Sequence, residues 1–103
     1  MNIEKRNDKE TLTITVSGRV DATTAPEFEK YLVDNIDDTT HLVLDLANLE
    51  YISSAGLRAI LTAQKIMSKQ GTMNLINVHY DLMEIFEMTG FAYVLNIETI
   101  EWK

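Results

Sequence analysis

The sequence predicts an α/β fold, a mixed sheet of about four to five strands with helices packed mainly on one face. Segments of strand character alternate with segments of helical periodicity, in the order β-β-α-β-α-β-α-β, which is typical of sheets with parallel strand pairs. Residues 11–17 alternate strictly between polar and apolar side chains, so one face of that strand is expected to contact water. A length of 103 residues suits one domain.

The first two strands are expected at residues 3–6 and 11–17, joined by a turn through residues 7–10. Gly18 is interpreted as the end of the second strand. Together these segments predict a hairpin at the N-terminus.

The first helix is expected to begin at Thr24, with Thr24 as its N-cap, Pro26 in the first turn and Glu27 closing a capping box. It should end within residues 35–38. Its apolar residues recur at helical spacing and predict a buried stripe. The stripe consists of Ala25, Phe28, Leu32 and Ile36.

A nearly continuous apolar run at residues 41–46 predicts a central strand that is covered more completely than the second strand. A loop is expected over residues 47–52. The second helix follows, with Gly71 as its C-terminal stop. Its core-facing residues are expected to be Leu57, Ile60, Leu61 and Met67, with Arg58, Thr62, Lys65 and Lys69 on the opposite face.

The remaining elements are a strand at residues 73–78, a short helix around residues 82–86 and a last strand at about residues 94–100. His79 is expected to open the helix and Gly90 to stop it. This completes the alternation of strands and helices.

Composition narrows the classes of function. The absence of cysteine excludes disulfides, thiol catalysis and thiolate metal ligation, and it fits a reducing cytosol. No apolar run approaches the ~20 residues of a membrane span, and the charged N-terminus is unlike a signal peptide. A net charge of −7 argues against nucleic-acid binding. We therefore expect a cytoplasmic protein without a membrane span.

Signatures of catalysis and metal binding are scarce. His41 and His79 stand alone, without the i, i+4 spacing of a metal-binding helix. The chain has no phosphate-cradling glycine loop and no Gly-x-Ser-x-Gly nucleophile motif. Asp34, Asp37 and Asp38 are interpreted as a solvated helix end. We expect no enzyme activity, no catalytic residue, no cofactor and no metal site.

The segment most able to carry function lies at the start of the second helix. Ser53 and Ser54 stand directly before an apolar helical stripe. The first N–H groups of a helix lack internal partners, and the helix dipole adds positive potential there. A hydroxyl at that place can cap the helix or carry a phosphate. Gly56 costs ~1 kcal/mol relative to alanine in a helix, which indicates a close backbone approach.

Four segments resemble the STAS family of anti-sigma factor antagonists. Residues 51–58, Tyr-Ile-Ser-Ser-Ala-Gly-Leu-Arg, resemble its phosphorylation-site motif, and residues 42–46 match the strand that precedes it. Residues 18–21 look like the family's Gly-x-x-Asp signature, and residues 86–91 are similar to its C-terminal helix ending. In their order and spacing they indicate a single STAS domain over residues 1–103.

The resemblance implies partner switching. In that family the unphosphorylated antagonist binds an anti-sigma factor and so releases a sigma factor. The anti-sigma factor is also a serine kinase, which phosphorylates the antagonist and thereby ejects it, and a serine phosphatase resets the system. By position the phosphorylated residue is Ser54. The partner-binding residues implied are Asp21, Thr23, Ser53, Ser54, Ala55, Gly56 and Arg58.

The chain departs from the family at Ser53, where many members have aspartate, so Ser53 stays an alternative phosphorylation site. Asp21 can equally be a polar loop residue ahead of a helix, and Arg58 a solvated side chain. Tyr51 is expected to pack beneath the loop and Trp102 to cap a core edge, both outside the site.

Two other functions remain open. The first is a stand-alone STAS docking subunit of a lipid-transport or stress-signalling complex, not regulated by phosphorylation. The second is a binder or enzyme that holds a small anion at the same helix start, which the lack of a general base near Ser54 disfavours. A monomer is expected in each case.

Overall fold

The computed structural model describes residues 1–100, so Trp102 lies outside the described residues. Strands and helices alternate as predicted. The elements are β1 (Asn2–Asp8), β2 (Thr11–Val20), α1 (Ala25–Ile36), β3 (His41–Asp45), β4 (Leu49–Ile52), α2 (Ser54–Met67), β5 (Thr72–Val78), α3 (Tyr80–Thr89), the 3-10 helix η1 (Phe91–Tyr93) and β6 (Asn96–Thr99).

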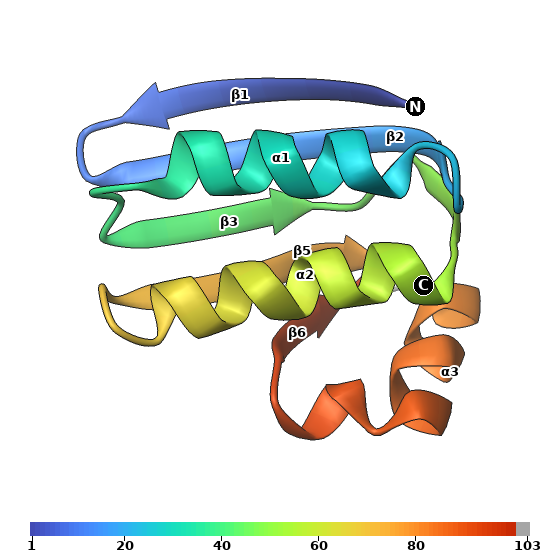
Figure 1. Cartoon of the computed structure of the whole chain (residues 1–103). Helices are drawn as coiled ribbons and strands as arrows, with labels where there is room; N and C mark the ends of the chain where they lie inside the picture. Colours follow the sequence, from blue (N-terminus) through green and yellow to red (C-terminus); the bar gives the residue numbers. More distant parts are fainter. Residues whose placement is uncertain (101–103) are drawn as a thin grey trace.

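The strands form one mixed sheet in the order β1-β2-β3-β5-β6 (Figure 1). β1 pairs antiparallel with β2, whereas β2, β3, β5 and β6 pair in parallel. A short sixth strand, β4, lies off this path and pairs in parallel with β2. The predicted α/β fold with a mixed sheet is confirmed, with one strand more than expected.

β4 occupies part of the segment that was predicted as a loop. It lies beside the last residues of β2, Gly18–Val20, so β2 pairs first with β3 and then with β4. Gly18 does not end β2, because the strand continues through it with a φ of 81°. Glycine adopts this left-handed conformation without steric cost, and the Gly18 N–H donates to the Asn48 carbonyl at 3.0 Å.

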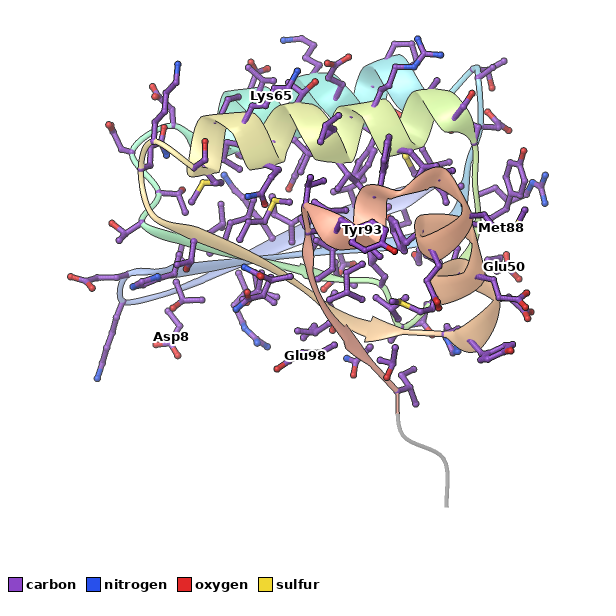
Figure 2. The ribbon with its side chains drawn as sticks, turned by 90° about the horizontal axis from the view of Figure 1, so that it is seen from below. Asp8, Glu50, Lys65, Met88, Tyr93 and Glu98 are labelled. Carbon is purple, nitrogen blue, oxygen red and sulfur yellow. The ribbon has the colours of Figure 1, made fainter. Side chains whose placement is uncertain are left out.

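Helices α1 and α2 lie side by side on one face of the sheet, as predicted (Figures 1 and 2). The opposite face carries Asp8 and Glu98 in Figure 2 and is left uncovered by α1 and α2. The predicted stripe of α1 is confirmed, since all four of its residues are buried. Facing them in the core are Leu12, Ile14, Val16, Leu42, Leu44, Met73 and Leu75.

The second helix differs in detail from the prediction. It ends at Met67, and Leu61 is only half-buried, while three small residues enter the core instead. They are Gly56, Ala59 and Ala63. Gly71 lies four residues beyond the end of α2 with no left-handed φ. A Cβ there would lie 1.9 Å from the Thr40 carbonyl oxygen, so close approach to that backbone is what requires glycine.

The C-terminal elements agree with the prediction except at the last strand. Gly90 ends α3 in the left-handed conformation with a φ of 82°, as expected of a C-terminal glycine. His79 is the N-cap of α3. β6 is shorter than predicted: it begins at Asn96, after η1 and its C-cap residue Val94, and ends at Thr99. Within residues 1–100, no helix is long and apolar enough to cross a membrane.

Candidate functional site

The start of α2 is held at the edge of the sheet where β2 and β4 end. Ser53 follows β4 directly, and its N–H donates to the Val20 carbonyl, the last residue of β2, at 2.8 Å. Since Val20 precedes Asp21, this bond brings the loop at residues 21–24 beside the first turn of α2. The structure thus brings together the two segments to which the sequence assigned partner binding.

The two serines have different environments. Ser53 has an extended backbone, and its Oγ accepts a hydrogen bond from the Gly56 N–H at 3.2 Å. Its carbonyl accepts from the Leu57 N–H at 2.9 Å, so Ser53 is the N-cap of α2. Ser54 is the first helical residue and its side chain is exposed. One hydroxyl is therefore engaged in the helix cap, and the other faces solvent.

Gly56 lets this turn lie against the sheet. A Cβ at Gly56 would lie 2.7 Å from Ile52 Cγ1 and 2.8 Å from Val20 Cγ1. Both of those side chains are buried, with exposed fractions of 3% and 0%. The close backbone approach predicted from the sequence is confirmed.

Gly56→Ala is expected to lower the free energy of unfolding by about 1–2 kcal/mol. Overpacking costs about 1–3 kcal/mol, and the better helix propensity of alanine returns up to about 1 kcal/mol. Urea unfolding measures the difference, with Lys65→Ala on the exposed face of α2 as a control expected within about 0.5 kcal/mol of wild type. A Gly56→Ala variant as stable as wild type would contradict this packing.

The loop ahead of α1 contains a reciprocal capping box. Asp21 Oδ1 accepts from the Thr23 and Thr24 N–H groups at 3.0 and 3.1 Å, while Thr24 Oγ1 accepts from the Asp21 N–H at 2.8 Å. The Ala25 N–H donates to the Asp21 carbonyl at 2.8 Å, so helical hydrogen bonding begins at Asp21. Thr24 directly precedes α1 and Pro26 lies in its first turn, as predicted. The predicted capping box of Thr24 with Glu27 is wrong, because Thr24 has a helical backbone and its side chain makes no cap hydrogen bond to α1.

These hydrogen bonds change the titration of Asp21. The Thr23 hydroxyl, which donates to Asp21 Oδ1 at 2.7 Å, and the two backbone N–H groups lower the pKa of Asp21 from 3.8 to about 2. Each bond favours the ionised carboxylate. Asp21 is thus a helix-capping residue beside the Ser53–Ser54 segment. Its contact with a partner remains a prediction.

Asp21→Asn is expected to remove a pH dependence of stability. Because folding lowers the pKa of Asp21, its stabilising effect is present above pH 3.8 and is lost as the pH falls toward about 2. The difference in unfolding free energy between wild type and Asp21→Asn should therefore be largest above pH 4 and shrink on acidification. Urea unfolding across this range measures it. A difference that is constant with pH would contradict the role of the charge.

Arg19 and Tyr51 form a contact that the sequence did not indicate. They are paired across β2 and β4, and the Arg19 guanidinium carbon lies 4.4 Å from the centroid of the Tyr51 ring. This is cation–π geometry. The ring is 39% exposed, so the prediction that Tyr51 packs beneath the loop is wrong. The contact depends on β4, which has no alternating pattern that would reveal it.

A shallow groove of about 440 Å³ lies between α1 and α2 beside the site. Its floor is made of small residues, and Thr62 Oγ1 donates to Glu29 Oε1 across it at 3.0 Å. Arg58 lines the groove one turn after Ser54, with an exposed side chain. The remaining lining residues are Ala22, Ala25, Pro26, Ala55, Leu61 and Lys65.

The start of α2 is a place where a negatively charged group is favoured. An exposed hydroxyl lies at a helix N-terminus, where the dipole favours negative charge. In the part of the chain that the structure describes, no group of three histidine, cysteine or acidic side chains could hold a metal ion. Ser54 is therefore an exposed hydroxyl at the first position of α2.

Comparisons with known proteins match nearly the whole chain to one family. The STAS domain family model matches residues 2–101. The anti-sigma-B factor antagonist of Listeria monocytogenes is 31% identical over 106 residues, which cover 98% of this chain and 93% of that protein.

Solved structures show the same fold. The anti-sigma factor antagonist from Mycobacterium paratuberculosis has a TM-score of 0.87 at 20% identity, and the match covers 96% of this chain and 86% of that one. The Bacillus cell fate determinant SpoIIAA in its phosphorylated form has a TM-score of 0.72 at 17% identity, with coverages of 95% and 92%.

Proposed function

The chain belongs to the STAS domain family, and we propose that it is an anti-sigma factor antagonist whose binding is switched by phosphorylation of Ser54. The unphosphorylated form binds an anti-sigma factor that is also a serine kinase, and a sigma factor is released. Phosphorylation of Ser54 ends the binding, and a serine phosphatase restores it. Residues 1–103 act as a single monomeric domain in the cytoplasm, and this role requires no catalysis by the chain itself.

The proposal rests on one observation: the two serines differ in hydrogen bonding and exposure. Ser53 Oγ accepts the Gly56 N–H, so a phosphate on Ser53 would have to replace that helix cap. Ser54 is exposed at the first helical position, so a kinase can reach its hydroxyl without opening the helix. This supports Ser54 over Ser53 as the phosphorylated residue.

The proposed switch acts through local charge. A phosphoserine carries a charge of about −1.5 to −2, and the helix N-terminus tolerates it in the free protein. In a complex the same charge must be desolvated and meets the acidic groups of the partner. Binding is therefore lost while the fold is retained.

The remaining contact residues surround Ser54. Asp21 and Thr23 lie in the loop that the Ser53–Val20 hydrogen bond holds beside α2. Ala55 and Gly56 are in the first turn of α2, and Arg58 follows on its exposed face. We propose that the anti-sigma factor contacts this surface.

Ser54→Asp is expected to weaken binding to the anti-sigma kinase encoded in the same genome by about 100-fold or more, corresponding to about 2.7 kcal/mol. Isothermal titration calorimetry measures the dissociation constant. Ser68→Asp is the matched control, because it adds the same charge at an exposed serine at the other end of α2 and should bind like wild type. Ser54→Asp binding with wild-type affinity would refute the switch.

A further inference from the structure

The exposed apolar side chains of the molecule gather on α3 and the segment after it. Six large hydrophobic residues are exposed within the described residues, and four of them lie in residues 80–94. Their exposed fractions are 72% for Tyr80, 86% for Met88, 92% for Tyr93 and 55% for Val94. Figure 2 shows Met88 and Tyr93 on the part of the molecule formed by α3 and η1.

The helical spacing places part of this group on one outward stripe of α3. Tyr80, Glu84 and Met88 follow one another at intervals of four residues, and all three are exposed. Leu82 and Phe86 on the opposite side are buried in the core. The outward exposure of Tyr80 and Met88 is therefore not needed to hold α3 in place.

The charged side chains within residues 80–94 are all acidic. No lysine or arginine occurs from residue 70 to residue 102, although the chain has nine elsewhere. Asp81, Glu84 and Glu87 are all exposed on α3. We define the α3 patch as Tyr80, Glu84, Glu87, Met88, Tyr93 and Val94, an apolar surface set among carboxylates.

We propose that the α3 patch is a docking surface for a basic amphipathic helix of a partner protein. The aromatic rings and Met88 provide anchors that lose apolar area on binding, and methionine adapts to irregular surfaces. Glu84 and Glu87 complement lysine or arginine beside those anchors, which favours encounter and sets orientation. The α3 patch shares no residue with the surface proposed around Ser54, and the proposal does not depend on that switch.

The charge of the α3 patch favours a basic helix over a second copy of the chain and over an anionic membrane. A second copy docked through the same patch would bring two acidic surfaces together, because a two-fold contact pairs a surface with itself. An anionic membrane would meet the same carboxylates and be repelled. A basic helix matches both the apolar and the acidic parts of the patch.

The test uses the ¹⁵N-labelled full chain, titrated with a designed soluble helical peptide that has leucine on one face and lysine on the other. We expect amide shift changes centred on residues 80–94. A charge-inverted peptide with glutamate in place of lysine should cause none. Shifts that are absent, or that centre on the acidic residues 34–38, would overturn the proposal.

Variants of the α3 patch test its acidic and its apolar residues separately. Glu84→Lys combined with Glu87→Lys should weaken peptide binding about tenfold or more, whereas Asp8→Lys combined with Glu10→Lys, an equal charge change on the β1–β2 turn, should not. Met88→Ser should weaken it as well, because an anchor is lost. Equal binding by both charge variants would overturn the proposal. The same shifts on phosphatidylglycerol vesicles, or on raising the protein concentration alone, would also overturn it, in favour of a membrane or a second copy.

Discussion

Phe28→Ala is expected to lower the free energy of unfolding by about 3–5 kcal/mol. Phe28 is fully buried, with an exposed fraction of 0%, and it belongs to the stripe that packs α1 on the sheet. Truncation removes the buried ring and leaves a cavity, and both effects favour unfolding. A domain of this size typically has only about 5–15 kcal/mol of stability, so the variant should be marginal.

Urea unfolding of Phe28→Ala and Val33→Ala measures this effect. Val33 lies on the same helix, but its side chain is 41% exposed, so its truncation should cost about 0.5 kcal/mol or less. A loss below about 1 kcal/mol for Phe28→Ala would contradict the position of that ring in the core.

Gly71→Ala is expected to be the other strongly destabilising change, at about 3 kcal/mol. Its Cβ would lie 1.9 Å from the Thr40 carbonyl oxygen and 2.9 Å from the carbonyl carbon. Backbone cannot move aside as the end of a side chain can. The Thr72 N–H also donates to that oxygen at 3.0 Å, so relief of the clash strains the entry into β5.

Gly90→Ala provides the matched control for Gly71→Ala. Nothing lies within 4 Å of a Cβ at Gly90, and only its φ of 82° disfavours alanine. That conformation costs about 1–2 kcal/mol. Thermal or urea unfolding of both variants should rank Gly71→Ala as clearly less stable. Equal losses would show that close approach to Thr40 does not constrain Gly71.

The periodic features of the fold could be predicted from the sequence. The strict alternation in β2 and the apolar stripe of α1 each indicate one buried face. The apolar residues of both patterns are buried in the structure. Gly56 was also informative, because glycine in a first helical turn has few uses other than close approach.

The features that depend on distant neighbours could not be predicted. β4 pairs with the end of β2, where the register shifts between Gly18 and Arg19, and its four residues show no alternation. The Arg19–Tyr51 contact follows from that pairing. The capping box lies one turn earlier than predicted, at Asp21 instead of Thr24. The sequence could not decide between them, because aspartate caps a helix as well as threonine does.

At the candidate site, the sequence placed two hydroxyls at a helix start but could not assign their roles. Either serine can serve as an N-cap. The structure distinguishes them, because Ser53 is the N-cap whose Oγ accepts from the Gly56 N–H, and Ser54 is the first helical residue with an exposed side chain. This difference supports the proposal that Ser54 is the phosphorylated residue.

Mapping the phosphate by fragmentation mass spectrometry tests the phosphorylation switch most directly. The chain is incubated with ATP and the anti-sigma kinase encoded in the same genome, and the products are separated by size before analysis. We expect a single phosphate on Ser54, none in Ser54→Ala, and elution of the modified chain apart from the kinase. A phosphate on Ser53 instead, or a chain modified on Ser54 that still elutes with the kinase, would contradict the proposed switch.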